Sequence, residues 1–506
     1  MYGISFNQAV PRSPSDPNRM DVACFVGLVR RRTNPAIPAH LREWWERNGW
    51  YARMADNGLD LPVPLESWQE FAALFATTRA AVGSDASVEC YLANVVRQFF
   101  AQGGRRCYVV CMGDPLPVRS TTAQKIPVLG QLLFGDYQLW NGLAGWDSWQ
   151  DSYFPSFSTG TETRNDWHGV DHLLGLPDVA MLSFPDLSDL LGADAAVWVP
   201  LLAPATTEIF AECAPTTVAP AEQTWSLGSA PRCDEDAYAA WVRVVGALTR
   251  FVREAARELQ LVASLPLPQE DVRRDFTDRV LGSLLAQDAG AASAFVQVVY
   301  PWLRATPVSR VPGGIDPPEG FLVGMLAVQA LARGAAFTIA GKFPAGAVDL
   351  EPKPPQAWMG DGTLSERVSL FVQTVRGVQL FSDVTTSTDV VYRPASVNRL
   401  MAQVVRSARN YGVSATFEPL SAATWRALER SLAAFLNSLY STGALRGRSA
   451  DDAYTVRCDR STMTQNDIDQ GRLVAAVSFQ PSLPVERIQI DLAVDESGAM
   501  LTGAVL

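Results

Sequence analysis

Short continuous runs of apolar residues recur along this chain, and they constrain its fold more than any other feature of the sequence. Three of them, Ala23 to Val29, Cys107 to Met112 and Val179 to Phe184, have the length of a strand. Such runs are typical of strands that are buried on both faces of a sheet. Helical patterns separate them, and the capping-box pair Ser67 and Glu70 opens one of these helices. We therefore predict a mixed layer of helices and strands.

The last part of the chain has the clearest periodicity. Apolar residues at helical spacing predict one helix that follows Pro394 and ends at Gly412, and a second helix from Ser421 to Tyr440. Alternating apolar and polar residues predict half-buried strands at Tyr454 to Cys458 and at Ile488 to Val494. Two further elements are expected, a strand at Val413 to Phe417 and a long amphipathic helix over 235–262.

The composition excludes several classes of protein. Of the 506 residues, 48% are hydrophobic and 19% are charged, which is too apolar for a mostly disordered chain. The net charge of −11 argues against nonspecific binding to nucleic acid or to an anionic membrane. The longest apolar stretch, Gly320 to Gly341, contains Gln329 and Arg333, so we expect a buried core segment and no insertion into a membrane. The first residues do not read as a secretory signal.

Signatures of catalysis are sparse, and we predict neither an enzyme nor a bound cofactor. The sequence lacks a GxxxxGK[ST] phosphate loop, a GxGxxG after a strand, and a GxSxG nucleophile turn. His168 and His172 flank Asp171, which fits either a metal site of a hydrolase or a surface or capping role. The seven scattered cysteines are expected to be reduced thiols, and we interpret Cys107 and Cys111 as strand residues rather than a metal or redox pair.

Four tryptophans gather in a stretch that has little periodicity. Trp140, Trp146, Trp149 and Trp167 lie there among Gly, Ser, Asp and Tyr residues. Their ring faces could stack on sugars at a recognition surface, or they could form a small satellite core. Both interpretations stay open at the level of sequence.

The C-terminal block resembles the tail sheath proteins of contractile phages and related contractile injection systems. Four stretches carry the resemblance in order: TFEPLSAATW (Thr416 to Trp425), AFLNSLYSTGALRG (Ala434 to Gly447), AYTVRCDRSTMTQNDIDQGRL (Ala453 to Leu473) and PSLPVERIQI (Pro481 to Ile490). The first region is similar as well, through Ala23 to Gly27 and NVVRQFFAQGGRRCYVV (Asn94 to Val110), and GLPDVAMLSFPD resembles the family's central strand. Thr385 to Asp389 departs from the pattern, because an ARTLS-like sequence is common there.

The resemblance implies an α+β fold with a discontinuous core. Residues 20–113 and 311–484 would fold together as a mixed α/β sheath core, and 114–310 would form a central inserted domain on the outside. Residues 1–19 would be an N-terminal linking arm, and 485–506 would be a C-terminal linking strand.

The resemblance also implies a mechanical rather than a chemical role. Subunits of this kind stack as hexameric rings around an inner tube, in a metastable extended state that contracts and drives the tube through a target envelope. The implied partners are further copies of the chain, the inner tube protein, and the baseplate and terminal cap proteins. The subunit would assemble in the bacterial cytoplasm and then belong to a contractile particle. A surface or glycan recognition module built on the Trp-rich insert is the alternative.

Two sets of residues are candidates for the contacts of such an assembly. Strand exchange between subunits would use one short apolar strand near each end of the chain: Tyr2, Ile4 and Phe6 at the start, and Ile488, Ile490, Leu492 and Val494 near the end. The outer face of the helix from Ser421 to Tyr440 would face the inner tube through Arg426, Glu429 and Arg430, or it is simply a solvated face.

Overall fold

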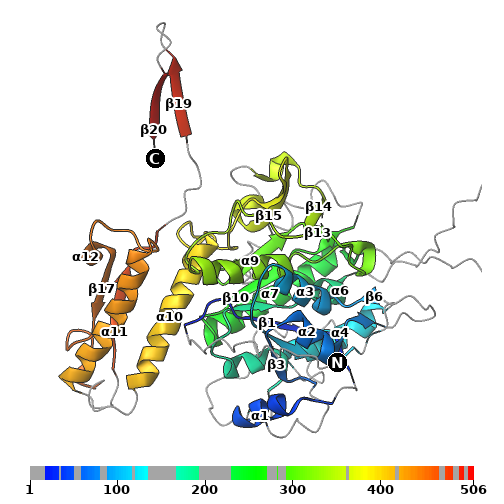
Figure 1. Ribbon diagram of the computed structural model, residues 1–506, viewed down its shortest axis with the longest axis horizontal. Coiled ribbons are helices and arrows are strands. Elements are labelled where there is room, and N and C mark those ends of the chain that lie inside the picture. The colour runs from blue at the N-terminus through cyan, green and yellow to red at the C-terminus, as the bar shows by residue number, and fades with distance from the viewer. Residues whose placement is uncertain are drawn as a thin grey trace, which may run out of the picture.

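One eight-stranded mixed sheet lies at the centre of the molecule (Figure 1). The computed structural model describes residues 18–32, 36–50, 59–79, 88–114, 116, 120–134, 164, 167–192, 230–269, 282, 292–359, 364–415, 421–466, 473–482, 489–494 and 500–505. Six parallel strands form the middle of the sheet, and one antiparallel strand closes each edge. In spatial order the strands are β16 (Gly377–Leu380), β15 (Val368–Thr374), β12 (Val296–Tyr300), β10 (Gln260–Ser264), β8 (Met181–Ser183), β1 (Ala23–Gly27), β7 (Cys107–Cys111) and β3 (Pro62–Leu65).

The three apolar runs singled out in the sequence form neighbouring strands of this sheet. They correspond to β1, β7 and β8, and β1 pairs with the other two in parallel. Every residue of these strands is buried, as expected where helices cover both faces of a parallel sheet. The strand interpretation of Cys107 and Cys111 is therefore confirmed.

The segment 114–310 differs from the expectation of a separate outer domain. Its strands β8, β10 and β12 lie in the middle of the main sheet, between β1 on one side and β15 on the other. Without them, the strands from the two flanking segments would not meet in one sheet. The boundaries at 114 and 310 therefore do not separate the core from an insert in the part of the chain that the structure describes.

The helix expected over 235–262 is shorter than predicted. α7 (Glu235–Ala255) begins at the cap residue Asp234, whose carboxylate accepts from the backbone N–H of Ala237, and it ends at Ala255. Residues 260–264 form β10 instead. An apolar run of five residues fits a buried strand as well as it fits a helix, and pairing with β8 and β12 decides between them here.

The long apolar stretch from Gly320 is confirmed as a core helix. α9 (Glu319–Ala332) packs against α3 (Tyr91–Ala101), and two glycines allow the close approach. A Cβ atom would lie 2.6 Å from the carbonyl oxygen of Val95 at Gly320, and 2.6 Å from the Cβ of Gln102 at Gly324. In the described residues, no helix combines the length and the apolar character needed to cross a membrane.

Shorter elements complete this part of the molecule, which we call the body and which comprises the described residues 18–394. The predicted capping box is present, because the Ser67 hydroxyl accepts from the N–H of Glu70 at the start of α2. The remaining helices are α1 (Ala39–Arg47), α2 (Trp68–Leu74), α4 (Thr122–Phe134), α6 (Leu187–Leu191) and the 3₁₀ turns η5 (Gly169–Gly175), η8 (Pro312–Gly314), η9 (Gln356–Met359) and η10 (Leu364–Glu366). The remaining strands are β2 (Arg30–Arg31), β4 (Phe75–Ala76), β5 (Thr78–Arg79), β6 (Val88–Glu89), β9 (Arg232–Cys233), β11 (Leu267–Pro268), β13 (Trp302–Ala305) and β14 (Ala347–Glu351).

A smaller unit follows the body, and the helix α10 (Ala395–Ala415) joins the two. This C-terminal lobe, residues 421–482, comprises α11 (Ala422–Ser441), α12 (Ala450–Ala453) and a two-stranded antiparallel sheet of β17 (Tyr454–Arg457) and β18 (Ala476–Phe479). Figure 1 shows α10 between the body and α11. α10 continues past Gly412 to Ala415, so the strand expected from Val413 is wrong for its first residues, because a glycine lowers helix propensity without ending the helix here.

The end of the chain forms a hairpin. β19 (Gln489–Val494) pairs antiparallel with β20 (Met500–Val505) in a sheet of two strands. The predicted strand near the chain end is therefore confirmed from residue 489 on, and its partner in this structure belongs to the same chain. Figure 1 shows the hairpin projecting away from the body and the lobe.

Candidate functional site

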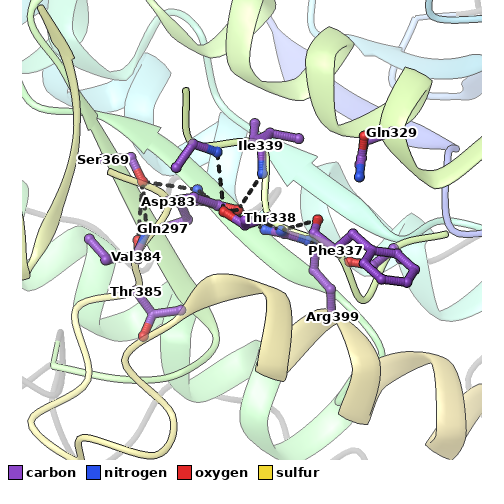
Figure 2. A network of polar contacts seen from close by, with 12 residues as sticks. Gln297, Gln329, Phe337, Thr338, Ile339, Ser369, Asp383, Val384, Thr385 and Arg399 are labelled. Carbon is purple, nitrogen blue, oxygen red and sulfur yellow. Dashed lines mark hydrogen bonds and ion pairs between the residues drawn. The ribbon is translucent and has the colours of Figure 1, made fainter. Parts of the chain in front are cut away.

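A buried carboxylate lies at the junction of the body and α10 (Figure 2). Asp383 accepts hydrogen bonds from the Arg399 guanidinium at 2.7 Å and 3.0 Å, and from the Thr338 hydroxyl and the Ile339 N–H at 3.0 Å each. Gln297 donates a fifth hydrogen bond at 2.9 Å. The side chains of Asp383 and Arg399 are only 1% and 6% exposed, so this ion pair lies inside the molecule.

On one side the network continues into the main sheet. The Gln297 amide of β12 also donates to the Ser369 hydroxyl of β15 at 2.9 Å, and the Gln260 amide of β10 donates to Gln297 at 2.9 Å. These three polar side chains are almost completely buried on adjacent strands. The position of Asp383 is therefore fixed by three strands of the body.

On the other side the network reaches a body segment that packs against the lobe. The Arg399 guanidinium donates to the carbonyl oxygens of Ala335 and Phe337 at 3.0 Å and 3.3 Å. The segment that carries these carbonyls packs into one of the lobe's small apolar cores, where Ala336 and Phe337 contact a cluster that includes Leu400 of α10 and Leu436 of α11. One arginine thus holds the sheet, α10 and this body segment together.

Electrostatics keep this pair charged. Burial by itself would raise the pKa of Asp383, but the Arg399 charge and the surrounding donors outweigh burial and hold that pKa below its ordinary value. A buried ion pair is seldom a large source of net stability, because desolvation opposes the attraction. Its directional hydrogen bonds instead specify one geometry, which suits a joint between two units.

A second arginine fixes α10 two helical turns further along. Arg406 is buried and donates to the backbone carbonyls of Arg19, Asp178, Val179 and Glu258, which belong to segments that precede β1, β8 and β10. Burial lowers the pKa of Arg406 to about 10, so the group stays charged at neutral pH. With Arg399 and Arg406 on the body side, α10 is attached at two points.

The predicted tube-facing residues lie on the outer side of α11. Arg426 and Arg430 are exposed and Glu429 is half-buried, while Leu428 and Leu432 face the lobe's interior. The guanidinium of Arg430 donates to the backbone carbonyl of Arg426 at 3.1 Å. The structure therefore brings the three charged side chains onto one helix but shows no binding partner for them.

The predicted linking strands are only partly described. Tyr2, Ile4, Phe6 and Ile488 lie outside the described residues. Three others belong to β19, where Ile490 is opposite Ala504, Leu492 opposite Thr502 and Val494 opposite Met500.

One of the four clustered tryptophans is described, and it belongs to a packed cluster. The ring of Trp167 contacts the ring of Trp50 edge to face at 6.5 Å, and the Arg164 guanidinium lies within 5.5 Å of both rings. Trp167 is thus partly buried and packs against the main apolar core of the body. Trp140, Trp146 and Trp149 lie outside the described residues.

The two histidines converge on a carboxylate that sequence reasoning missed. His168 Nδ1 lies 2.6 Å from one oxygen of Asp60, and His172 Nε2 lies 3.3 Å from the other. The indole N–H of Trp50 donates to His172 Nδ1 at 3.1 Å. The described residues contain no group of three or more His, Cys, Asp or Glu side chains that is suited to a metal ion. The Asp60 carboxylate also accepts from the backbone N–H of Gly169 at 2.8 Å, so it ties the start of η5 to the segment that carries Asp60.

The carboxyl edge of the sheet is filled by the chain's own acids. In doubly wound sheets, ligands bind where the strand order reverses, which is between β1 and β8 here. Asp186 occupies that point, and its carboxylate accepts from the Leu28 N–H at 2.7 Å. Glu319 accepts in the same way from the Ser264 N–H at the end of β10, at 2.9 Å. At these two strands the chain's own carboxylates therefore engage the backbone donors of Leu28 and Ser264.

The fold is the one found in contractile sheath structures. A chain of the anti-feeding prophage (AFP) baseplate in its contracted state superposes with a TM-score of 0.59 at 19% identity, over 98% of this chain and 99% of that chain. A chain of the PVC sheath complex, an extracellular contractile injection system in its contracted state, gives 0.54 at 19% identity over 98% and 97%. A chain of the contracted AFP helical sheath gives 0.53 at 17% identity over 97% and 100%. No family model and no curated protein matches the sequence.

The mixed α/β fold of sheath structures, which the sequence resemblance implied, is thus shown over nearly the whole chain, whereas the implied division into a core and an outer insert is not. The matches extend beyond the half of the sequence in which matching stretches were recognised. They cover the central segment as well, which agrees with its strands lying inside the main sheet.

Proposed function

We propose that this protein is a structural subunit of a contractile sheath around an inner tube. The observation that carries the proposal is the correspondence of fold along almost the full length of both chains, with structures that include a helical sheath. The carboxyl edge of the sheet supports a mechanical role, because Asp186 and Glu319 engage the backbone groups that a phosphate ligand would need. In this proposal hexameric rings stack helically in a metastable extended state, and contraction drives the tube through a target envelope.

The experiment that tests this function is electron microscopy of the overexpressed full chain. We expect striated hollow cylinders, with or without the inner tube protein, because an open helical assembly needs only copies of one subunit. Material that stays monomeric under all conditions, together with native particles whose outer wall lacks the protein, would contradict the proposal.

The chain ends are proposed to link neighbouring subunits by strand addition. Tyr2, Ile4 and Phe6 would form the linking strand near the start, and residues 488–494 the one near the end. Strand addition gains about 1 kcal/mol net for each backbone hydrogen bond, with little dependence on side chains. The chain without residues 1–10 should therefore fail to form ordered tubes, and ordered tubes from it would refute this link.

The outer face of α11 is proposed to contact the inner tube. Residues 421–482 hold seven arginines and six acidic residues, so this segment is nearly neutral in a chain whose net charge is −11, and Arg426 and Arg430 place two positive charges on one helix face. A complementary acidic tube surface would set the registry between tube and sheath.

Charge reversal tests the tube contact. Changing Arg426 and Arg430 to Glu should abolish co-assembly with the tube protein and leave empty sheath formation intact. Arg257→Glu is the matched control, because Arg257 is exposed and donates to the carbonyl four residues earlier, as Arg430 does. Normal co-assembly of the double variant would show that this face is merely solvated.

The remaining partners follow from the same proposal. Baseplate and terminal cap proteins would bind the two ends of the sheath, and the assembled particle would be the site of action. One matching chain belongs to an AFP baseplate structure, which supports a role close to a baseplate as much as a role in the bulk of a sheath.

A further inference from the structure

A rigid loop between β16 and α10 presents three apolar side chains to solvent. Val390 is 66% exposed, Val391 49% and Tyr392 38%, and the charged Asp389 precedes them. We call residues 389–392 the knob. Consecutive exposed apolar residues on a soluble protein are a typical mark of an interaction site.

The stem of the knob is fastened on both sides. The backbone N–H of Thr385 donates to the carbonyl of Arg393 at 2.7 Å, and its hydroxyl donates to the carbonyl of Tyr392 at 2.8 Å. At the tip, the Asp389 carboxylate accepts from the Val391 N–H at 2.8 Å. Thr386 donates to the carbonyl of Val296 at the start of β12 at 3.1 Å. The knob is therefore held in shape before any partner binds, which reduces the entropy lost on docking.

A second exposed feature lies at the other end of the same edge of the sheet. Val375 and Arg376 form the tight turn between β15 and β16, and both are exposed. The Arg376 guanidinium lies 4.8 Å from the ring centre of Phe343, which is 36% exposed. We call Phe343, Val375 and Arg376 the patch.

The knob and the patch lie at opposite ends of β15. The stem of the knob begins where Ser382 hydrogen-bonds to Val368 and Leu370 at the start of that strand, and the patch follows its last residue. Seven residues of strand separate the two features by about 20 Å. Because the two features lie at opposite ends of the strand, the knob of one copy can meet the patch of the next copy.

We propose that the knob of one copy docks on the patch of a second copy, as a head-to-tail contact of the assembly. The proposal rests on the proposed sheath function, which requires contacts between two different surfaces of the same chain. The two surfaces match in chemistry, since each is apolar, and they match in charge, since Asp389 is negative and Arg376 is positive. Docking would bury Val390 and Val391 against Phe343 and Val375.

Single substitutions in the knob test its importance. Val390→Asp and Val391→Asp should each lower the yield of sedimentable cylinders by about tenfold or more, because each places a charge in a buried apolar contact. Val308→Asp is the matched control, because Val308 is 73% exposed and belongs to neither surface. Melting temperatures close to that of the parent would show that the variants fold.

Charge exchange tests the pairing itself. Chains with Asp389→Arg should assemble poorly alone, as should chains with Arg376→Asp, because like charges then meet at each contact. An equimolar mixture should recover assembly, since each contact then joins opposite charges. A mixture that assembles no better than either single variant would overturn the proposal.

Disulfide trapping tests the geometry. In a chain with Val390→Cys and Val375→Cys, oxidation of assembled material should give a ladder of disulfide-linked oligomers. Reduction with dithiothreitol should convert this ladder back to monomers. Dimers alone would indicate a two-fold contact and would overturn the head-to-tail arrangement, as would monomers alone.

If the parent forms cylinders while the knob variants behave like Val308→Asp, the docking proposal fails and the sheath function stands. If the parent forms no cylinders, both fail.

Discussion

At the scale of single residues, the buried charged groups fix the geometry of the fold. Asp383 has five hydrogen-bond donors from four residues, and its partner Arg399 reaches two further backbone carbonyls. No single strand or helix could satisfy both groups, so the network forms only when the body and α10 are correctly placed. Specificity of this kind is a known use of buried polar groups, although it is not universal.

Removing one partner of the pair should be costly. Arg399→Met leaves the Asp383 carboxylate buried without its counter-charge, and we expect it to lower the free energy of unfolding by about 3–5 kcal/mol. Lys353→Met is a suitable comparison, because Lys353 pairs with Asp349 at 3.4 Å and their side chains are 72% and 39% exposed, where ion pairs contribute about 0–1 kcal/mol. Urea denaturation measures both. Equal effects would show that the buried pair has no special role.

The buried acids at the carboxyl edge should make stability depend on pH. Burial raises the pKa of Asp186 to about 7. A raised folded-state pKa means that the folded chain binds the proton more tightly than the unfolded chain does. The associated stability is fully present below the ordinary pKa of 3.8 and is lost as the pH rises from there to about 7.

Replacing the Asp186 carboxylate by a neutral amide tests whether its ionisation causes this pH dependence. Asp186→Asn keeps an oxygen that can accept from the Leu28 N–H, so we expect a higher melting temperature than the parent at pH 8 and a difference that shrinks toward pH 4. The difference between variant and parent isolates this group from Asp383, whose pKa is lowered and which acts in the opposite direction. The exposed Glu43→Gln should show no such trend. A difference that does not change with pH would contradict the raised pKa.

At the scale of elements, two glycines in helices provide opposite predictions. Gly320→Ala should destabilise the protein by about 1–3 kcal/mol, because its Cβ would clash with the backbone of α3. Gly412→Ala should stabilise it by about 0.5–1 kcal/mol, because α10 continues through this position and, outside its own helix, no atom of the described residues lies within 4 Å of the new Cβ. Thermal or urea unfolding of the two variants measures both signs. Destabilisation by Gly412→Ala would indicate that α10 ends at this glycine, as the sequence pattern first predicted.

Elements with local signals could be predicted from the sequence, and elements decided by distant partners could not. Ser67 with Glu70 specifies a helix start within four residues, and the runs in β1 and β7 are too apolar to lie anywhere but in a core. By contrast, residues 260–264 become a strand only because β8 and β12 lie on either side. The expected boundary at 114 failed for the same reason, since sheet order is a property of pairing rather than of composition.

The candidate site was hidden from the sequence in a similar way. Asp383 lies in a stretch without periodicity, and its partners are between 16 and 86 residues away along the chain. Asp60 is 108 residues from His168. No local pattern marks such pairs, whereas Arg426, Glu429 and Arg430 could be placed on one face from helical spacing alone.

At the scale of the whole molecule, the body and the lobe have separate apolar cores that meet at α10. Ala402 packs with the body, while Leu400 and Val404 pack with the lobe, so α10 belongs to both. A small core is only marginally stable by itself. The lobe should therefore open more readily than the body does.

Hydrogen exchange can separate the two units. Leu436 is fully buried in the lobe, so Leu436→Ala should cost about 2–5 kcal/mol there and speed exchange in β17 and β18. Exchange in β1 and β7 should stay as slow as in the parent, because these strands lie in the other core. Leu261→Ala in β10 is the matched control, since it weakens the body instead. If Leu436→Ala sped exchange equally in β1 and β17, the junction at Arg399 and Arg406 would couple the two units into one cooperative fold, and a lobe that opens by itself would be excluded.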